Sequence, residues 1–181
     1  TGDKAVKIGG ENVFPLYSFD AAIENAPKVG IEITDFGMEH EPECIKKYYE
    51  GCATLADMAR KAASMEGVDF LSFRMEGGDP NGANKSTEEL IGELKEIADA
   101  VDLPLVVCGC KNVEKDAELF SKAAEALNGK NAVILSAKEE NYKTVGAAAG
   151  LAYKQVVGAE SAVDINLAKQ LNVLISQLGE I

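Results

Sequence analysis

Apolar runs and longer amphipathic stretches alternate along most of this chain. The short runs are rich in Val, Ile, Leu and Phe and have the length of buried strands. Most are followed by a segment in which apolar residues recur every three or four positions, as on one face of a helix. Repeated units of this kind are typical of α/β proteins with a parallel sheet. We expect strands at residues 29–34, 69–73, 105–108, 132–135 and 156–159.

The helices between these strands carry start signals and apolar stripes. Ser86-Thr87-Glu88-Glu89 and Ser136-Ala137-Lys138-Glu139 match the capping box, in which a serine accepts a hydrogen bond from a backbone amide and a glutamate reaches back. Ser161 or Asp164 can begin the last helix. Another helix is expected at about residues 54–65, after a charged bridge at 39–50. Two stripes are interpreted as core: Leu90, Leu94, Ile97 and Val101, and Leu167, Leu171, Leu174 and Leu178.

The number of units bears on the architecture. A chain of 181 residues, 46% of them hydrophobic, suffices for one domain, which we place at residues 1–181. Residues 1–27 form an N-terminal extension, in which Gly9-Gly10 and Pro15 indicate a hairpin at the bottom of a barrel. A closed (β/α)8 barrel needs eight strands and typically ~250 residues. We therefore expect a partial TIM barrel of about five units, as a fragment of a longer barrel; the alternative is an open doubly wound parallel sheet.

Composition excludes several classes of function. A net charge of −12 argues against a nucleic-acid partner, because phosphate contacts need clustered Lys and Arg. No apolar run approaches the roughly 20 residues that span a bilayer, and no leader opens the chain, so we expect a soluble, cytoplasmic protein without a membrane partner. No Walker or dinucleotide motif is present, which argues against a nucleotide cofactor.

The cysteines and the histidine restrict the chemistry further. His40 is the only histidine, which disfavours both a Cys/His zinc site and a Ser-His-Asp triad. Cys44, Cys52, Cys108 and Cys110 lack the spacing of a disulfide framework. Cys108 ends an apolar run, so a buried, inert thiol is the favoured interpretation, with a reactive or metal-binding thiol as the alternative.

Polar residues gather where the expected strands end. In parallel α/β proteins, ligands bind at the carboxyl ends of strands, because the loops there can vary above a rigid sheet. The glycine-rich loop from Glu76 to Asn84 either binds a ligand or merely needs its glycines and proline to turn. We assign no catalytic residue and no metal ligand. The candidate binding residues are Glu76, Asp79, Asn81, Cys108, Gly109, Ser136, Asn141, Glu160 and Asp164.

Several of these segments also form a set of motifs. They are Lys7-Ile8-Gly9-Gly10-Glu11-Asn12 with Pro15 and Phe19-Asp20, Glu76-Gly77-Gly78-Asp79-Pro80, Pro104-Leu105-Val106-Val107-Cys108-Gly109-Cys110 with Glu114-Lys115-Asp116, Asn141-Tyr142-Lys143, and Asp164-Ile165-Asn166-Leu167-Ala168-Lys169-Gln170-Leu171-Asn172. Together they resemble the small, or delta, subunit of the corrinoid iron-sulfur protein in the acetyl-CoA decarbonylase/synthase complex. The resemblance covers essentially the whole chain.

The resemblance implies a fold, a cofactor and partners. The fold would be a TIM barrel paired with a larger subunit that holds a [4Fe-4S] cluster and most of a cobalamin-type corrinoid site. The cobalt would accept a methyl group from a methyl-tetrahydropterin, through a methyltransferase, and pass it to acetyl-CoA synthase in the acetyl-CoA (Wood-Ljungdahl) pathway. This chain would be a non-catalytic subunit whose strand-end residues position and shield the corrinoid.

Two other functions remain open at this stage. In one, the barrel itself binds the methylated pterin as a methyltransferase, through Asp35, Asp79 or Asn141. Alternatively the chain is a purely structural partner that contributes only an interface.

Overall fold

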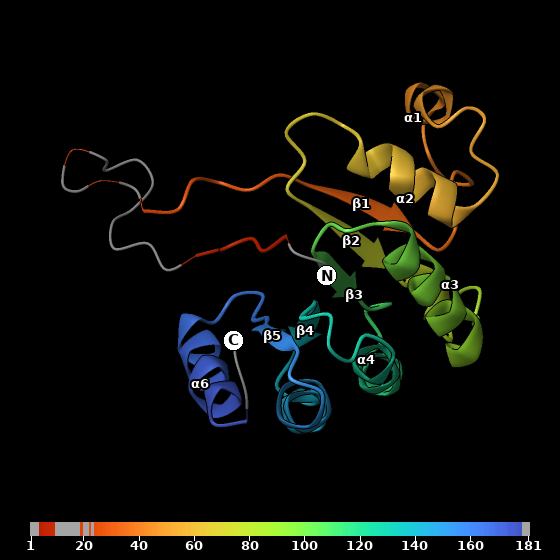
Figure 1. Ribbon diagram of the computed structural model, residues 1–181. Coiled ribbons are helices and arrows are strands. Elements are labelled where there is room, and N and C mark those ends of the chain that lie inside the picture. Colours follow the sequence, from red (N-terminus) through yellow and green to blue (C-terminus); the bar gives the residue numbers. More distant parts are fainter. Residues whose placement is uncertain (1–3, 10–18, 20–21, 23, 179–181) are drawn as a thin grey trace.

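A curved sheet of parallel strands forms the centre of the molecule, and helices follow it along one face (Figure 1). This computed structural model describes residues 4–9, 19, 22 and 24–178. All five expected strands are present within two residues of their expected bounds, and their order in the sheet is their order in the chain. The strands are β1 (Gly30–Thr34), β2 (Phe70–Arg74), β3 (Leu105–Cys108), β4 (Val133–Ala137) and β5 (Val156–Ala159).

The helices connect neighbouring strands, except the last one, which follows the last strand. Because a crossover between adjacent parallel strands is right-handed, sequential strand order brings successive helices to the same face. Within the described part of the chain, none of them has the length and apolar character needed to cross a bilayer. They are α1 (Glu43–Tyr48), α2 (Leu55–Ala63), the 3-10 turn η1 (Glu76–Gly78), α3 (Thr87–Ala100), α4 (Val113–Ala126), α5 (Tyr142–Val145), the π-helical segment η2 (Gly146–Ala152) and α6 (Ile165–Ser176).

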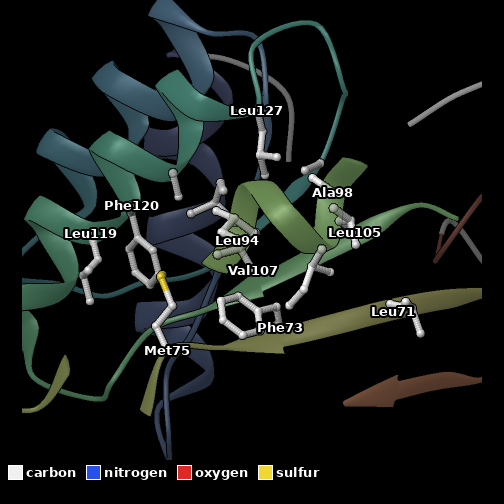
Figure 2. Close-up of a cluster of buried hydrophobic side chains, with 14 of the residues drawn as sticks. Leu71, Phe73, Met75, Leu94, Ala98, Leu105, Val107, Leu119, Phe120 and Leu127 are labelled. Atoms are coloured by element: carbon white, nitrogen blue, oxygen red, sulfur yellow. The ribbon is translucent and has the colours of Figure 1, made fainter. Parts of the chain in front are cut away.

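The core lies between the sheet and its helices. One row of side chains crosses all the strands in register and is almost completely buried: Ile33, Phe73, Val107, Ile134 and Val157. Figure 2 shows Phe73 and Val107 of the sheet beside Leu94 of α3, with Leu119 and Phe120 of α4 nearby. The stripe predicted on α3 is buried throughout, which confirms that it is core.

The opposite face of the sheet carries the alternate residues of each strand, because strand side chains alternate between faces. No helix of the described residues covers this face in Figure 1, and we call it the open face. The last row of residues on this face, nearest the carboxyl ends of the strands, is polar on β1 and β2 and apolar on β4 and β5. In register, that row consists of Thr34, Arg74, Cys108, Leu135 and Gly158.

The N-terminal segment lies at the opposite end of the strands. Lys4, Val6 and Ile8 line a cavity of about 230 Å³ together with Phe70 and Val133. The hairpin expected in this extension falls largely on residues outside those that the structure describes, so it stays a prediction.

Two local expectations were wrong. Ser136 does not cap a helix: it lies within β4, since the apolar strand runs two residues further than expected, and the next helix begins only at Tyr142. On α6, Leu171 and Ile175 are buried whereas Leu174 is 37% exposed. This helix packs at the sheet edge, against β5 and α5, so it buries only a narrow stripe.

The other helix starts are as expected. The side chain of Ser86 accepts a hydrogen bond from the amide of Glu89. The side chain of Asp164 accepts from the amides of Asn166 and Leu167 at the start of α6.

The two leucines of α6 give a matched test of this packing. Leu171→Ala removes a side chain that is 1% exposed, and we expect it to lower the free energy of unfolding by about 2–5 kcal/mol. Leu174→Ala removes one that is 37% exposed and should cost about 0.5 kcal/mol or less. Urea denaturation followed by circular dichroism measures both. Equal losses would show that α6 packs differently.

Candidate functional site: a polar pocket at the strand ends

A pocket lies on the open face, where β2, β3, β4 and β5 end. Its volume is about 300 Å³, at the lower end of the range of small-molecule sites. Polar side chains form most of its wall, and Cys108, Gly109 and Leu135 supply the remainder. We call it the strand-end pocket. It is lined by Arg74, Cys108, Gly109, Lys111, Asp116, Leu135, Ser136, Lys138 and Glu160.

The turn between β3 and α4 is built around the carboxylate of Asp116. This side chain reaches back from the first turn of α4, and its Oδ1 accepts a hydrogen bond from the amide of Cys110 at 2.7 Å. A Cβ atom at Gly109 would lie 2.2 Å from the same oxygen, so only glycine fits there. Lys111 follows with a φ of 72°, a left-handed conformation that is uncommon for lysine. The buried carboxylate thus holds one wall of the pocket in place.

Burial also affects the charge of this carboxyl group. Asp116 is 5% exposed, and removal from water raises its pKa above the usual value. Hydrogen bonds from Cys110 and Lys111 oppose this shift without cancelling it. As the pH falls, Asp116 would therefore take up a proton at a higher pH than an exposed aspartate does.

Three other charged groups of the pocket lie near an opposite charge: Arg74, Lys138 and Glu160. Arg74 donates to both carboxylate oxygens of Glu32, from Nε and from a terminal nitrogen, at 2.9 Å each. This hydrogen bonding raises the pKa of the guanidinium further. Across the pocket, Ser136 Oγ donates to Glu160 Oε2 at 2.5 Å. Lys138 Nζ is 3.9 Å from the same oxygen, which is too far for a hydrogen bond but close enough for attraction.

The two buried thiols have the character of packing groups. Burial raises the pKa of Cys108, whose sulfur lies 3.5 Å from Ser72 Oγ. Burial also raises the pKa of Cys110, to about 11. Both are therefore protonated near neutral pH, whereas the thiolate is the reactive form. Among the described residues, no group of three or more metal-ligating side chains is found.

The structure brings only some of the predicted residues together. Cys108, Gly109, Ser136 and Glu160 line the pocket. Asn141 is buried, accepts a hydrogen bond from the amide of Lys138 at 2.7 Å and donates to a backbone carbonyl, so it shapes the loop after β4. Asp164 caps α6.

Glu76, Asp79 and Asn81 lie on the separate loop after β2, and they do not line the pocket. Within this loop Asp79 Oδ1 accepts hydrogen bonds from the backbone and side-chain nitrogens of Asn81. Such a side-chain-to-backbone bond is typical of a turn. Both Glu76 and Asn81 are exposed.

A second buried carboxylate holds the loop after β2. Asp35, just after β1, accepts from the amide of Gly77 at 2.9 Å and lies 3.0 Å from Lys85 Nζ. Lys85 also lies 3.3 Å from Glu93, whose other carboxylate oxygen is buried without a hydrogen-bond partner. Burial raises the pKa of Glu93. A Cβ at Gly77 would come within 2.3 Å of the Asp35 carboxylate, so this glycine is also required by space.

Four charged residues of the pocket were absent from the sequence-based candidates: Arg74, Lys111, Asp116 and Lys138. Arg74 ends β2 on the open face, a position that the alternation of strand residues would have indicated. Asp116 gave no such signal, because acidic residues are common in the first turn of a helix for reasons unrelated to binding.

The fold and the pocket define an α/β protein with a parallel sheet and a small polar pocket at the carboxyl ends of its strands. Comparison with known families is more specific. The chain belongs to the CO dehydrogenase/acetyl-CoA synthase delta subunit family, whose model matches residues 1–180. This confirms the resemblance noted in the sequence motifs.

Curated relatives carry a consistent name, acetyl-CoA decarbonylase/synthase complex subunit delta. The protein from Methanothermobacter thermautotrophicus is 32% identical over 97% of this chain and 45% of its own length. The proteins from Methanocaldococcus jannaschii and Archaeoglobus fulgidus are 31% and 30% identical, over 97% and 95% of this chain and 43% and 38% of their own lengths. The chain therefore spans less than half the length of these relatives.

The contact between Gly109 and Asp116 can be tested with two glycine substitutions. Gly109→Ala places a methyl group against the buried carboxylate and should lower the free energy of unfolding by about 1–3 kcal/mol. Gly92→Ala, in the middle of α3 with nothing within 4 Å of the new methyl group, should raise it by about 0.5–1 kcal/mol. Chemical denaturation compares them. A neutral Gly109→Ala would mean that the turn is not built on this carboxylate.

Thiol labelling tests the burial of the cysteines. At pH 8 only roughly 0.1% of Cys110 is thiolate, given a pKa of about 11. Iodoacetamide should therefore modify the exposed Cys44 well before Cys110 or Cys108. Peptide mass spectrometry over a time course gives the order in which the cysteines are labelled. Unfolding in urea should remove the difference in labelling rate between them. Rapid labelling of Cys108 in the folded protein would contradict the interpretation of this thiol as a packing group and would support the alternative that it is reactive.

Proposed function

We propose that this chain is a non-catalytic subunit that helps to position and shield a corrinoid in a methyl-carrying protein. The methyl group would travel from a methyl-tetrahydropterin, through a methyltransferase, to acetyl-CoA synthase. Family membership supports the assignment, because the relatives are named as subunits of the acetyl-CoA decarbonylase/synthase complex. The observation that carries it is the polar strand-end pocket on an open sheet face. A larger partner subunit would hold the [4Fe-4S] cluster and most of the corrinoid.

The donors and acceptors of the pocket fit the periphery of a corrinoid. A corrin ring carries neutral amide side chains, and the pocket offers an ammonium, a hydroxyl and a carboxylate within reach of one another. Lys138, Ser136 and Glu160 would hold this periphery. When bound, the cobalt of the corrinoid supplies the methyl-transfer chemistry, and this chain binds, orients and excludes water.

The sheet itself is proposed to be part of a TIM barrel. Sequential strand order with helices on one face is the arrangement of (β/α)8 strands. An apolar cavity of about 440 Å³ borders β1, lined by residues such as Ile31, Ile33 and Met58. The relatives are more than twice as long, so further strands would have room to cover the β1 edge and the open face.

The pterin-binding alternative has less support. The side chain of Asp35 is completely buried and is bonded to Gly77 and Lys85. The amide of Asn141 is bonded to the backbone of Lys138 and Val113. Asp79 accepts hydrogen bonds from Asn81. All three side chains that would hold a pterin ring thus already have partners within the chain.

Purification of the complex tests the proposed function. The chain, co-expressed with its partner subunit in cells supplied with corrinoid, should elute with a corrinoid absorption band. Lys138→Glu sets a second carboxylate beside Glu160 and should lower corrinoid occupancy at least severalfold. Lys143→Glu makes the same charge change on the exposed side of α5 and serves as the control. A complex without corrinoid, or an isolated chain that binds methyl-tetrahydropterin tightly, would refute the proposal.

A further inference from the structure

The chain contains two asparagine–glycine pairs, Asn81-Gly82 and Asn128-Gly129, and all four residues are exposed. In such a pair the backbone nitrogen of the glycine can attack the side-chain amide of the asparagine, because glycine has no side chain to hinder the approach. The reaction requires that both groups are free to meet. Neither pair lines the strand-end pocket, so this chemistry is separate from the proposed function.

The first pair is held in place by Asp79. Asn81 donates to the Asp79 carboxylate from its backbone nitrogen at 3.0 Å and from its side-chain nitrogen at 3.2 Å. The Gly82 amide, which would be the attacking group, donates to the Asp79 carbonyl at 2.9 Å. Attack on the side chain would require these hydrogen bonds to break. The turn therefore protects Asn81, although this residue is exposed.

The second pair lies in the loop between α4 and β4 and is not held in this way. Among the described residues, neither the side chain of Asn128 nor the amide of Gly129 has a hydrogen-bond partner. The backbone amide of Asn128 donates to the Glu125 carbonyl at 3.3 Å, which leaves its side chain free. Gly129 has a φ of 82°, a left-handed conformation that glycine adopts readily. The two reacting groups are thus neighbours with no hydrogen bond to break.

The ends of this loop are fixed, in contrast to its exposed middle. The side chain of Gln155, which is 1% exposed, accepts from the amide of Ala132 at 2.6 Å and donates to the carbonyl of Leu127 at 3.1 Å. Leu127 and Ala132 are themselves completely buried. The backbone between them must therefore span a fixed distance. A longer backbone would strain the hydrogen bonds that satisfy these buried groups.

We infer that Asn128 is a site of spontaneous deamidation in the folded protein and that Asn81 is protected. The Gly129 nitrogen forms a bond to Cγ of Asn128, the bond from Cγ to Nδ2 breaks, and the side-chain nitrogen leaves as ammonia with the Gly129 proton. Water then opens the cyclic imide to aspartate or isoaspartate. Isoaspartate carries the main chain through the side-chain carbon, so it lengthens the backbone between Leu127 and Ala132 and weakens the Gln155 contacts.

The test follows both asparagines in the purified full chain during weeks in mildly alkaline buffer. Peptide mass spectrometry measures the conversion of amide to acid at each site, and the same chain in guanidinium chloride gives the rates without structure. Folding should slow the reaction by roughly tenfold or more at Asn81 and by less than about threefold at Asn128. Asp79→Ala removes the carboxylate that holds Asn81 and should speed its reaction at least severalfold. Equal protection of the two sites, or faster reaction at Asn81, would overturn the inference.

The effect on the loop has a separate measurement. The isoaspartate form, detected with a methyltransferase specific for isoaspartyl residues, should unfold at a lower denaturant concentration than the fresh protein. Asn128→Gln is the matched control, because glutamine does not readily form the cyclic imide; its denaturation midpoint should not change with storage. An isoaspartate form with the midpoint of the fresh protein would show that the Gln155 contacts tolerate a longer backbone, which contradicts the inferred effect. Neither measurement depends on corrinoid binding.

Discussion

The structure depends on the alternation of side chains along five parallel strands that follow one another in order. Each strand places every second residue under the helices, and the in-register row from Ile33 to Val157 is buried as a result. Right-handed crossovers keep successive helices on one face, so the other residues of each strand face away from them. Charged groups such as Arg74 and Glu32 can therefore occupy a strand without entering the core. The same geometry brings four strand ends together around one pocket.

Two loops at these strand ends are held in place in the same way. Asp35 supports the loop after β2 and Asp116 the loop after β3, and each is a buried carboxylate that accepts a hydrogen bond from a loop amide. In each case a carboxylate oxygen occupies the space where the Cβ of a loop residue would lie. That residue is therefore glycine, Gly77 in the first loop and Gly109 in the second. Burying a carboxylate is unfavourable unless its oxygens are satisfied. Lys85 provides that satisfaction for Asp35, whereas Asp116 relies mainly on backbone amides and has a raised pKa.

Much of the fold could be predicted from the sequence, because strand runs and helix stripes depend on local periodicity. The errors have local causes as well. Ser136 begins a perfect capping box, yet β4 extends past it, since pairing with β5 outweighs a local helix signal. Leu174 has the correct spacing for the core, but α6 lies at the sheet edge and buries a narrower stripe. The pocket was harder to predict: Ser136, within β4, and Glu160, just after β5, were among the candidates and line it, whereas Asp116 acts through a contact that only the folded turn creates.

The Cys108-Gly109-Cys110 turn shows how residue type can mislead about chemistry. Two thiols at a strand end suggest a nucleophile or a metal site, but burial keeps both protonated at neutral pH. The informative residue of the three is Gly109, whose missing side chain admits the Asp116 carboxylate. That contact holds the wall of a pocket whose accessible groups, Lys138 and Glu160, belong to other strand ends. The rigid support of the pocket and its accessible charges thus come from different residues, so changes at Lys138 or Glu160 can alter the charge of the pocket without loss of the turn that shapes it.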